Sequence, residues 1–150
     1  MKEEEIILRF NRAKFNELSK TEQELIEKAK DAFSIAYAPY SGFLVGASVL
    51  LENAKIISGN NQENVAYPAG LCAERVALFY AGSKYPEVGI KTIAISAKLK
   101  TFEIKDVVSP CGSCRQVMAE YQQKQGKNIR ILLHSHNDDI LIAEQQLQIL

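Results

Sequence analysis

The spacing of hydrophobic and polar residues changes several times along the chain, and each change predicts a helix or a strand. Residues 43–51 and 92–97 are nearly continuous apolar runs, which are typical of strands covered on both faces. The other predicted elements are strands over residues 55–59, 129–133 and 140–142, and helices over residues 21–36, 71–80, 111–123 and 143–150. This alternation predicts one α/β sheet with helices on both faces.

Local signals predict where these elements begin and end. Thr21 and Glu24 have the spacing of a capping box, so we expect the first helix to begin at Thr21. Pro39 stops that helix and begins a loop. Residues 1–15 carry a weak pattern, and we expect them to form an N-terminal arm or a short strand.

Length and charge restrict the class of protein. A chain of 150 residues is expected to form a single domain over residues 1–150. Its formal net charge of zero argues against a nucleic-acid partner and favours a small substrate. Because the chain lacks a long apolar run and begins with an acidic segment, we expect no membrane association and a cytoplasmic location.

Two short motifs contain all three cysteines of the chain. One runs from Cys72 through Glu74 to Arg75, and the other places Cys111 and Cys114 after a proline. Three thiolates fill three corners of a zinc tetrahedron and leave the fourth for water, as in a catalytic zinc site. Glu74 is placed to move protons to and from that water. Arg75 is placed to offset part of the negative charge of the thiolates.

Each part of this pattern has a plainer interpretation when it is taken alone. The Cys111-x-x-Cys114 pair is also typical of a thioredoxin-like redox motif. A structural zinc site would need a fourth ligand, and His134 and His136 are the only histidines. Both lie in a predicted turn, so we interpret them as solvated loop residues. The three thiols together with the carboxylate favour the catalytic interpretation.

The chain resembles the small zinc-dependent cytidine deaminases, in their three-cysteine homotetrameric form. The resemblance extends from about residue 22 to residue 133 and rests on the four blocks 39–47, 61–64, 72–75 and 109–116. It implies a three-layer α/β/α sandwich around a five-stranded mixed sheet, with one Zn²⁺ per subunit. It also implies a homotetramer with shared active sites.

The activity implied by this resemblance is the hydrolytic deamination of cytidine and 2′-deoxycytidine to uridine and 2′-deoxyuridine plus ammonia, in pyrimidine salvage. Zinc-bound hydroxide would attack C4 of the base, and Glu74 would be the proton shuttle. One alternative is a deaminase of a related aminopyrimidine nucleoside such as blasticidin S. A more distant alternative is a redox or structural zinc module without hydrolysis.

Substrate-binding residues follow from the same resemblance. Asn61 and Glu63 would bond the ribose 3′-hydroxyl, and a loop rich in amides with one carboxylate suits a sugar. The plainer interpretation is a turn whose Asn side chains satisfy their own backbone. Phe43 would pack against the base, although by pattern alone it is a core strand residue. The backbone of Ala73 and the carbonyl of Ser109 would contact the pyrimidine edge.

Tyr67 would face the 5′-hydroxyl of a nucleoside bound in a neighbouring subunit. Two features depart from the family pattern. Val65 replaces a small residue, which changes the approach of that loop. The chain also lacks a terminal aromatic after Leu150, from which we expect weaker substrate binding rather than lost chemistry.

Overall fold

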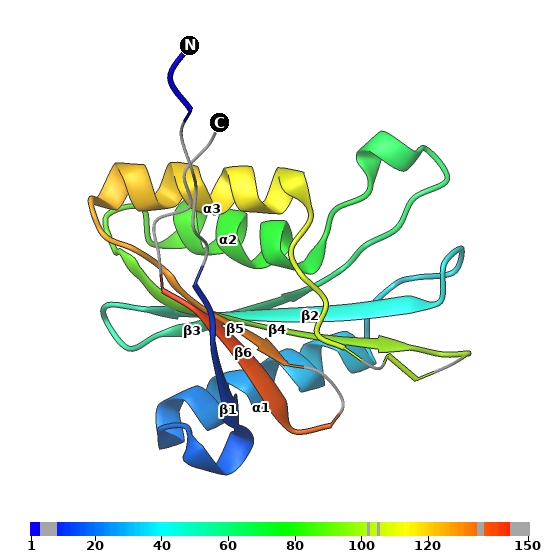
Figure 1. Cartoon of the computed structure of the whole chain (residues 1–150). Coiled ribbons are helices and arrows are strands. Elements are labelled where there is room, and N and C mark those ends of the chain that lie inside the picture. The colour runs from blue at the N-terminus through cyan, green and yellow to red at the C-terminus, as the bar shows by residue number, and fades with distance from the viewer. Residues whose placement is uncertain (4–8, 102, 105, 135–136, 145–150) are drawn as a thin grey trace.

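The computed structural model describes residues 1–3, 9–101, 103–104, 106–134 and 137–144 (Figure 1). Its strands are β1 (Asn11–Lys14), β2 (Phe43–Leu51), β3 (Ile56–Asn60), β4 (Ile90–Leu99), β5 (Arg130–His134) and β6 (Asp139–Ala143). Its α-helices are α1 (Lys20–Ser34), α2 (Ala73–Lys84) and α3 (Gly112–Gln125). Single turns of 3-10 helix cover Phe15–Glu17 and Tyr67–Ala69.

The strands form one mixed sheet in the order β1-β6-β5-β4-β2-β3. Among the strands of the described residues, only β4 and β5 pair in parallel, with Thr92 opposite Arg130 at one end and Ser96 opposite His134 at the other. The remaining neighbours pair antiparallel. A parallel pair needs a crossover connection, and α3 is the helix of that crossover.

The described part of the sheet has six strands, whereas the sequence comparison implied five. The sixth is β1, which pairs antiparallel with β6 from Asn11 opposite Ile142 to Lys14 opposite Asp139. Its four residues are polar or small and mostly exposed, so they lack the alternation by which a strand is recognised. The prediction of an N-terminal arm or short strand is met in part, because residues 4–8 lie outside the described residues.

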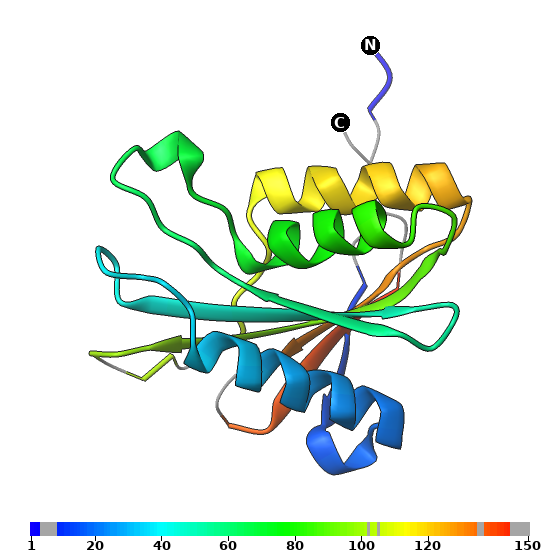
Figure 2. The ribbon, with the colours of Figure 1, turned by 180° about the vertical axis from the view of Figure 1, so that it is seen from behind.

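Helices cover both faces of the sheet, as the order of elements predicts. Helix α1 lies on one face, and α2 and α3 lie side by side on the other (Figures 1 and 2). Alternate residues of the strands belong to the two separate cores. On the α2/α3 side lie Ala47, Val49, Ile93, Ile95, Ile131 and Leu133, and on the α1 side lie Leu50, Ala94, Leu132, Ile140 and Ile142. The three-layer α/β/α fold is therefore confirmed.

The start of α1 corrects one prediction. The N-cap is Ser19 rather than Thr21: its hydroxyl accepts a hydrogen bond from the Glu22 backbone N–H at 3.3 Å. The Glu22 carboxylate accepts one from the Ser19 backbone N–H at 2.9 Å. Both serine and threonine satisfy the capping pattern in the sequence. Tertiary contact decides between them, because Glu22 also accepts a hydrogen bond from Arg130 Nε at 2.7 Å.

Other boundaries differ by a few residues. The strand predicted over residues 43–51 is confirmed in full, whereas α2 begins two residues later than predicted and extends to Lys84. The predicted final helix over residues 143–150 is not tested beyond residue 144, and Ala143 itself ends β6. No helix in the described ranges has the length and apolarity needed to cross a membrane.

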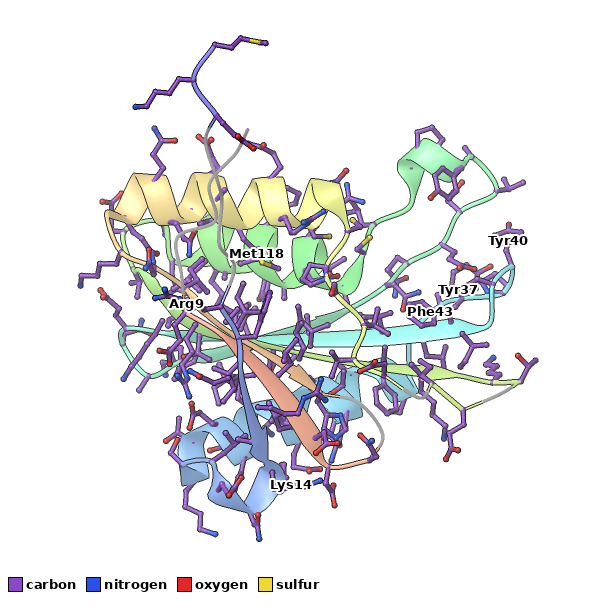
Figure 3. All side chains as sticks on the ribbon, in the orientation of Figure 1. Arg9, Lys14, Tyr37, Tyr40, Phe43 and Met118 are labelled. Carbon is purple, nitrogen blue, oxygen red and sulfur yellow. The ribbon has the colours of Figure 1, made fainter. Side chains whose placement is uncertain are left out.

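Helices α2 and α3 run in the same direction, so their N-terminal ends lie at the same edge of the sheet (Figure 1). The Tyr121 hydroxyl on α3 donates a hydrogen bond to the Leu78 carbonyl on α2 at 3.0 Å. A Cβ atom at Gly82 would lie 2.2 Å from that hydroxyl oxygen, so glycine permits this close contact. Met118 is fully buried beneath α3 (Figure 3). This packing brings the two cysteine motifs together.

The corrected cap of α1 can be tested by substitution. Ser19→Ala is expected to lower the free energy of unfolding by about 1 kcal/mol, because it leaves a backbone N–H of the first turn without its acceptor. Thr21→Ala is the matched control and should change stability by less than about 0.5 kcal/mol. Urea denaturation at one protein concentration measures both. A larger loss for Thr21→Ala would restore the original prediction.

Candidate metal centre and nucleoside site

All three cysteine thiols lie at the N-terminal ends of the paired helices. Cys72 is the N-cap of α2, Cys111 is the N-cap of α3, and Cys114 lies in the first turn of α3. Their three Sγ atoms lie within 4.8 Å of one another. The structure contains no disulfide between them. The two motifs separated by 39 residues therefore form one cluster.

The spacing of the thiols fits a tetrahedral metal ion. The Sγ atoms of Cys72 and Cys111 lie 3.9 Å apart. Two thiolates bound to one tetrahedral zinc at about 2.3 Å each would lie about 3.8 Å apart. Three soft sulfur ligands suit zinc and leave one coordination position for a further ligand. The donor set and the geometry thus agree with a zinc site of the catalytic type.

The helix ends and the neighbouring side chains favour a thiolate in the cluster. Hydrogen bonding from Cys114 and contact with Arg75 lower the pKa of Cys72 to about 5. The same hydrogen bond, together with burial, raises the pKa of Cys114. The N-terminal ends of both helices also place the positive end of their dipoles near the sulfur atoms, which favours a thiolate. Cys72 is therefore the thiol of the cluster that most readily loses its proton.

Arg75 lies beside the cluster, as predicted. Its Nη2 atom lies 3.8 Å from the Sγ of Cys72. Its Nε atom is buried and has no hydrogen-bond partner among the described residues. A guanidinium beside three sulfur ligands offsets part of their negative charge and holds Cys72 in place.

Glu74 is buried directly beside the thiols. It is the second residue of α2, and only 5% of the residue is exposed. Burial raises the pKa of its carboxyl group, and the negative charge of Cys72 acts in the same direction, while a hydrogen bond with Cys114 opposes them. A buried carboxyl group with a raised pKa is typical of a general acid–base residue.

Asn61 is occupied by the backbone of β2. Its Oδ1 accepts a hydrogen bond from the Val45 N–H at 2.8 Å, and its Nδ2 donates to the Phe43 carbonyl at 2.9 Å. The amide therefore continues the pairing of β3 with β2 beyond the last strand residue, Asn60. This differs from the plainer interpretation, in which the Asn side chains satisfy the backbone of their own turn, because Asn61 binds the backbone of a distant strand. Each polar atom of its amide can still make a second hydrogen bond.

Glu63 is bound to the loop that precedes β2. One carboxylate oxygen accepts hydrogen bonds from the backbone N–H groups of Tyr40 at 2.9 Å and Ser41 at 3.3 Å. The other accepts one from the Ser41 hydroxyl. These bonds lower the pKa of Glu63, the largest effect being that of the Ser41 hydroxyl. Ser41 lies in the 39–47 block, but its position there did not predict this contact.

The loop that holds Asn61 and Glu63 is connected directly to the thiol cluster. Gln62 forms a parallel bridge with Tyr37 and an antiparallel bridge with Leu71, the residue before Cys72. The backbone bonds between Gln62 and Leu71 measure 2.9 and 3.0 Å. The position of the polar loop relative to the first cysteine is thus set by backbone pairing.

The remaining predicted substrate residues lie around the same region. Phe43 is half-buried at the start of β2, and Figure 3 shows it on the same side of the molecule as Tyr37 and Tyr40. Ala73 is fully buried at the start of α2, and Ser109 is exposed ahead of α3. Tyr67 is 91% exposed.

His134 corrects the interpretation of the histidines as solvated. It ends β5, is only 6% exposed, and its Nδ1 lies 3.2 Å from the Ser96 hydroxyl on β4. His134 directly follows an apolar run in the sequence. At that position, the sequence pattern does not distinguish the last residue of a strand from the first residue of a turn. His134 is also outside the metal-binding group formed by the three cysteines among the described residues. His136 lies outside the described residues.

Three clustered thiols with a buried carboxylate beside them, on an α/β fold, are the arrangement expected of a metal-dependent hydrolytic enzyme. Comparison with known proteins gives the family. Residues 19–127 match the family described as the cytidine and deoxycytidylate deaminase zinc-binding region. The chain belongs to this family, so its cofactor is zinc and it is a deaminase. This excludes the redox interpretation of Cys111 and Cys114 as the function of the chain.

Curated relatives and a solved structure agree with this assignment. A cytidine deaminase of Halalkalibacterium halodurans is 47% identical over 98 residues, which cover 65% of this chain and 70% of the relative. One from Sporosarcina psychrophila is 44% identical over 99 residues, which cover 66% and 68%. The crystal structure of cytidine deaminase from Burkholderia pseudomallei superposes with a TM-score of 0.71 at 36% identity, covering 83% of this chain and 93% of that one.

Removal of a thiol tests which residues bind the metal. Cys111 is exposed and its side chain makes no capping hydrogen bond, so Cys111→Ala should leave folding nearly unchanged. It is expected to reduce bound zinc from about one ion per chain to background, because two thiolates hold zinc poorly. Ser113→Ala, an exposed change in the same turn, is the control. Elemental analysis of the purified proteins measures both, and full zinc in Cys111→Ala would place the metal elsewhere.

Proposed function

We propose that this protein converts cytidine and 2′-deoxycytidine to uridine and 2′-deoxyuridine with release of ammonia. The observation that carries the proposal is the buried Glu74 beside three clustered thiols. A structural zinc site needs no such carboxylate, and burying one without a function is costly. The names of the curated relatives support cytidine as the substrate.

In the proposed mechanism Cys72, Cys111 and Cys114 hold the zinc ion. When bound, that ion supplies Lewis-acid activation of a water molecule by lowering its pKa. Glu74 would carry both protons of the attacking water in turn: the first goes to the ring nitrogen as the water adds, and the second goes from the new hydroxyl to the amino group that leaves as ammonia. Its burial suits a proton carrier, because burial raises the pKa of the carboxyl above that of an exposed glutamate.

The proposed substrate contacts extend from the metal centre to the polar loop. The backbone of Ala73 and the carbonyl of Ser109 bind the pyrimidine edge, and Phe43 packs against the ring. Asn61 and Glu63 bind the ribose 3′-hydroxyl. Glu63 retains acceptor capacity for this contact, because a carboxylate offers about four acceptor positions and the described residues occupy three.

Substitution of the carboxylate tests the mechanism. Glu74→Gln is nearly isosteric and is expected to keep about one zinc per chain while kcat for cytidine falls at least about a hundredfold, because the amide cannot exchange the proton. Glu24→Gln, an exposed change on α1, should keep both zinc and turnover. Loss of cytidine absorbance together with elemental analysis provides both readings. Retained turnover in Glu74→Gln would exclude it as the proton shuttle.

We also propose that the active protein is a homotetramer in which neighbouring subunits share active sites, and that it works in cytoplasmic pyrimidine salvage. The exposed apolar side chains near the site support the assembly: Phe79 and Tyr80 on α2 are 46% and 50% exposed, and Val65 is 84% exposed. Tyr67 is also 91% exposed and has no ring contact within its own chain among the described residues, as expected of a residue that serves a neighbour. A reducing compartment suits three free thiols.

Mixed assemblies test whether subunits share a site. If Tyr67 serves a neighbour, Glu74→Gln and Tyr67→Ala subunits complement each other, and random exchange should restore about a quarter of the sites. Activity at low cytidine concentration should then exceed the average of the two separate variants. Mixing without subunit exchange is the control. Activity equal to that average after exchange would show that Tyr67 acts within its own chain or not at all.

A substrate panel separates cytidine from related aminopyrimidine nucleosides such as blasticidin S. Recognition of an unmodified ribose by Asn61 and Glu63 predicts that cytidine has the higher kcat/KM. A higher value for the modified nucleoside would keep the chemistry and change the substrate.

A further inference from the structure

The Ser41 hydroxyl is placed at the centre of the hydrogen-bond network around the polar loop. It donates to one carboxylate oxygen of Glu63 and accepts a hydrogen bond from the Phe43 backbone N–H at 3.0 Å. One small group therefore contacts both the residue proposed for the ribose and the residue proposed for the base. A hydroxyl can do this because it offers one donor and two acceptor positions.

The Ser41 hydroxyl orients one of the two carboxylate oxygens of Glu63, because the other bonds of Glu63 are made by the second oxygen. The backbone N–H groups of Tyr40 and Ser41 both bind Oε2. Only the Ser41 hydroxyl binds Oε1 among the described residues. Rotation of the carboxylate about its last bond is therefore blocked by a donor on each oxygen. Oε1 keeps a free lone pair in a fixed direction, which is what a sugar hydroxyl requires of a single acceptor.

We propose that Ser41 is a positioning residue for substrate recognition, which orients Glu63 Oε1 toward the ribose 3′-hydroxyl. This inference rests on the proposed function of the site, and it assigns to Ser41 a role that acts through Glu63 rather than by contact with the reacting atoms. Ser41 is itself exposed, so its removal should leave the core intact. Removal of the Ser41 hydroxyl should lower kcat/KM for a substrate that carries a 3′-hydroxyl and should have a small effect on a substrate that lacks it.

The experiment compares cytidine with 3′-deoxycytidine in the zinc-loaded protein. Ser41→Ala is expected to lower kcat/KM for cytidine about tenfold, the size of one hydrogen bond to a charged group. For 3′-deoxycytidine the loss should be about threefold or less, which reflects only the lost bond to Phe43. The preference for the 3′-hydroxyl, measured as the ratio of kcat/KM for cytidine to kcat/KM for 3′-deoxycytidine, therefore falls. A purely structural role would lower both kcat/KM values by the same factor.

Three further variants make the comparison specific. Ser41→Thr keeps the hydroxyl and should restore the preference. Ser58→Ala, an exposed change on β3, should leave both substrates unaffected. In a Glu63→Ala background, Ser41→Ala should no longer change the preference, because the two residues act through one contact. Dissociation constants of uridine and 3′-deoxyuridine give the same comparison without turnover.

The outcomes are distinguishable. Equal losses for the two substrates in Ser41→Ala, or an unchanged preference, would overturn the role of Ser41 while leaving the deaminase proposal intact. An additional loss of preference in the Glu63→Ala background would show that Ser41 acts independently of Glu63 and would also overturn the inference. Failure of the unaltered protein to deaminate cytidine would overturn the proposed function and this inference together.

Discussion

The arrangement of the site depends on the packing of α2 against α3. The two helices run in the same direction over one face of the sheet, and the contact between Tyr121 and Leu78 holds them together. Because Cys72 and Cys111 are the N-caps of the two helices, the distance between the helices sets the distance between the thiols. Helix packing at a distance from the thiols thus contributes to the geometry of the metal centre, together with the contact of Arg75 with the Cys72 sulfur.

The same helix ends produce two opposite electrostatic effects. The hydrogen bond from Cys114 and the neighbouring Arg75 lower the pKa of Cys72, whereas the same hydrogen bond and burial raise the pKa of Cys114. Two residues after Cys72, Glu74 is nearly buried, and burial raises the pKa of its carboxyl. A thiol with a lowered pKa and a carboxyl with a raised pKa are therefore adjacent. Hydrolytic deamination needs both of these properties in one place.

The polar loop extends this organisation from the metal toward the substrate. Backbone bridges of Gln62 with Tyr37 and Leu71 fix the loop relative to Cys72. The side chains of Asn61 and Glu63 then fix the start of β2 and the turn before it. Residues proposed to bind the sugar thus also support the fold. A hydrogen bond to the protein and a hydrogen bond to the substrate are compatible here, because amide and carboxylate groups have several donor or acceptor positions.

The sequence alone predicted the layers and the complete strand β2, and it singled out the three cysteines that the fold brings together and the carboxylate that it buries. Apolar spacing and a short motif are local properties of the chain. It could not choose Ser19 over Thr21 as a cap, since both fit the pattern and the choice depends on Arg130. It left residues 1–15 open between an arm and a short strand, because the polar residues of β1 become a strand only by pairing with β6. The burial of His134 and the central position of Ser41 likewise required the tertiary structure. Each of these features depends on a partner distant in the sequence or on the direction of a hydrogen bond. The spacing of residues along the chain encodes neither the distant partner nor the direction of the bond.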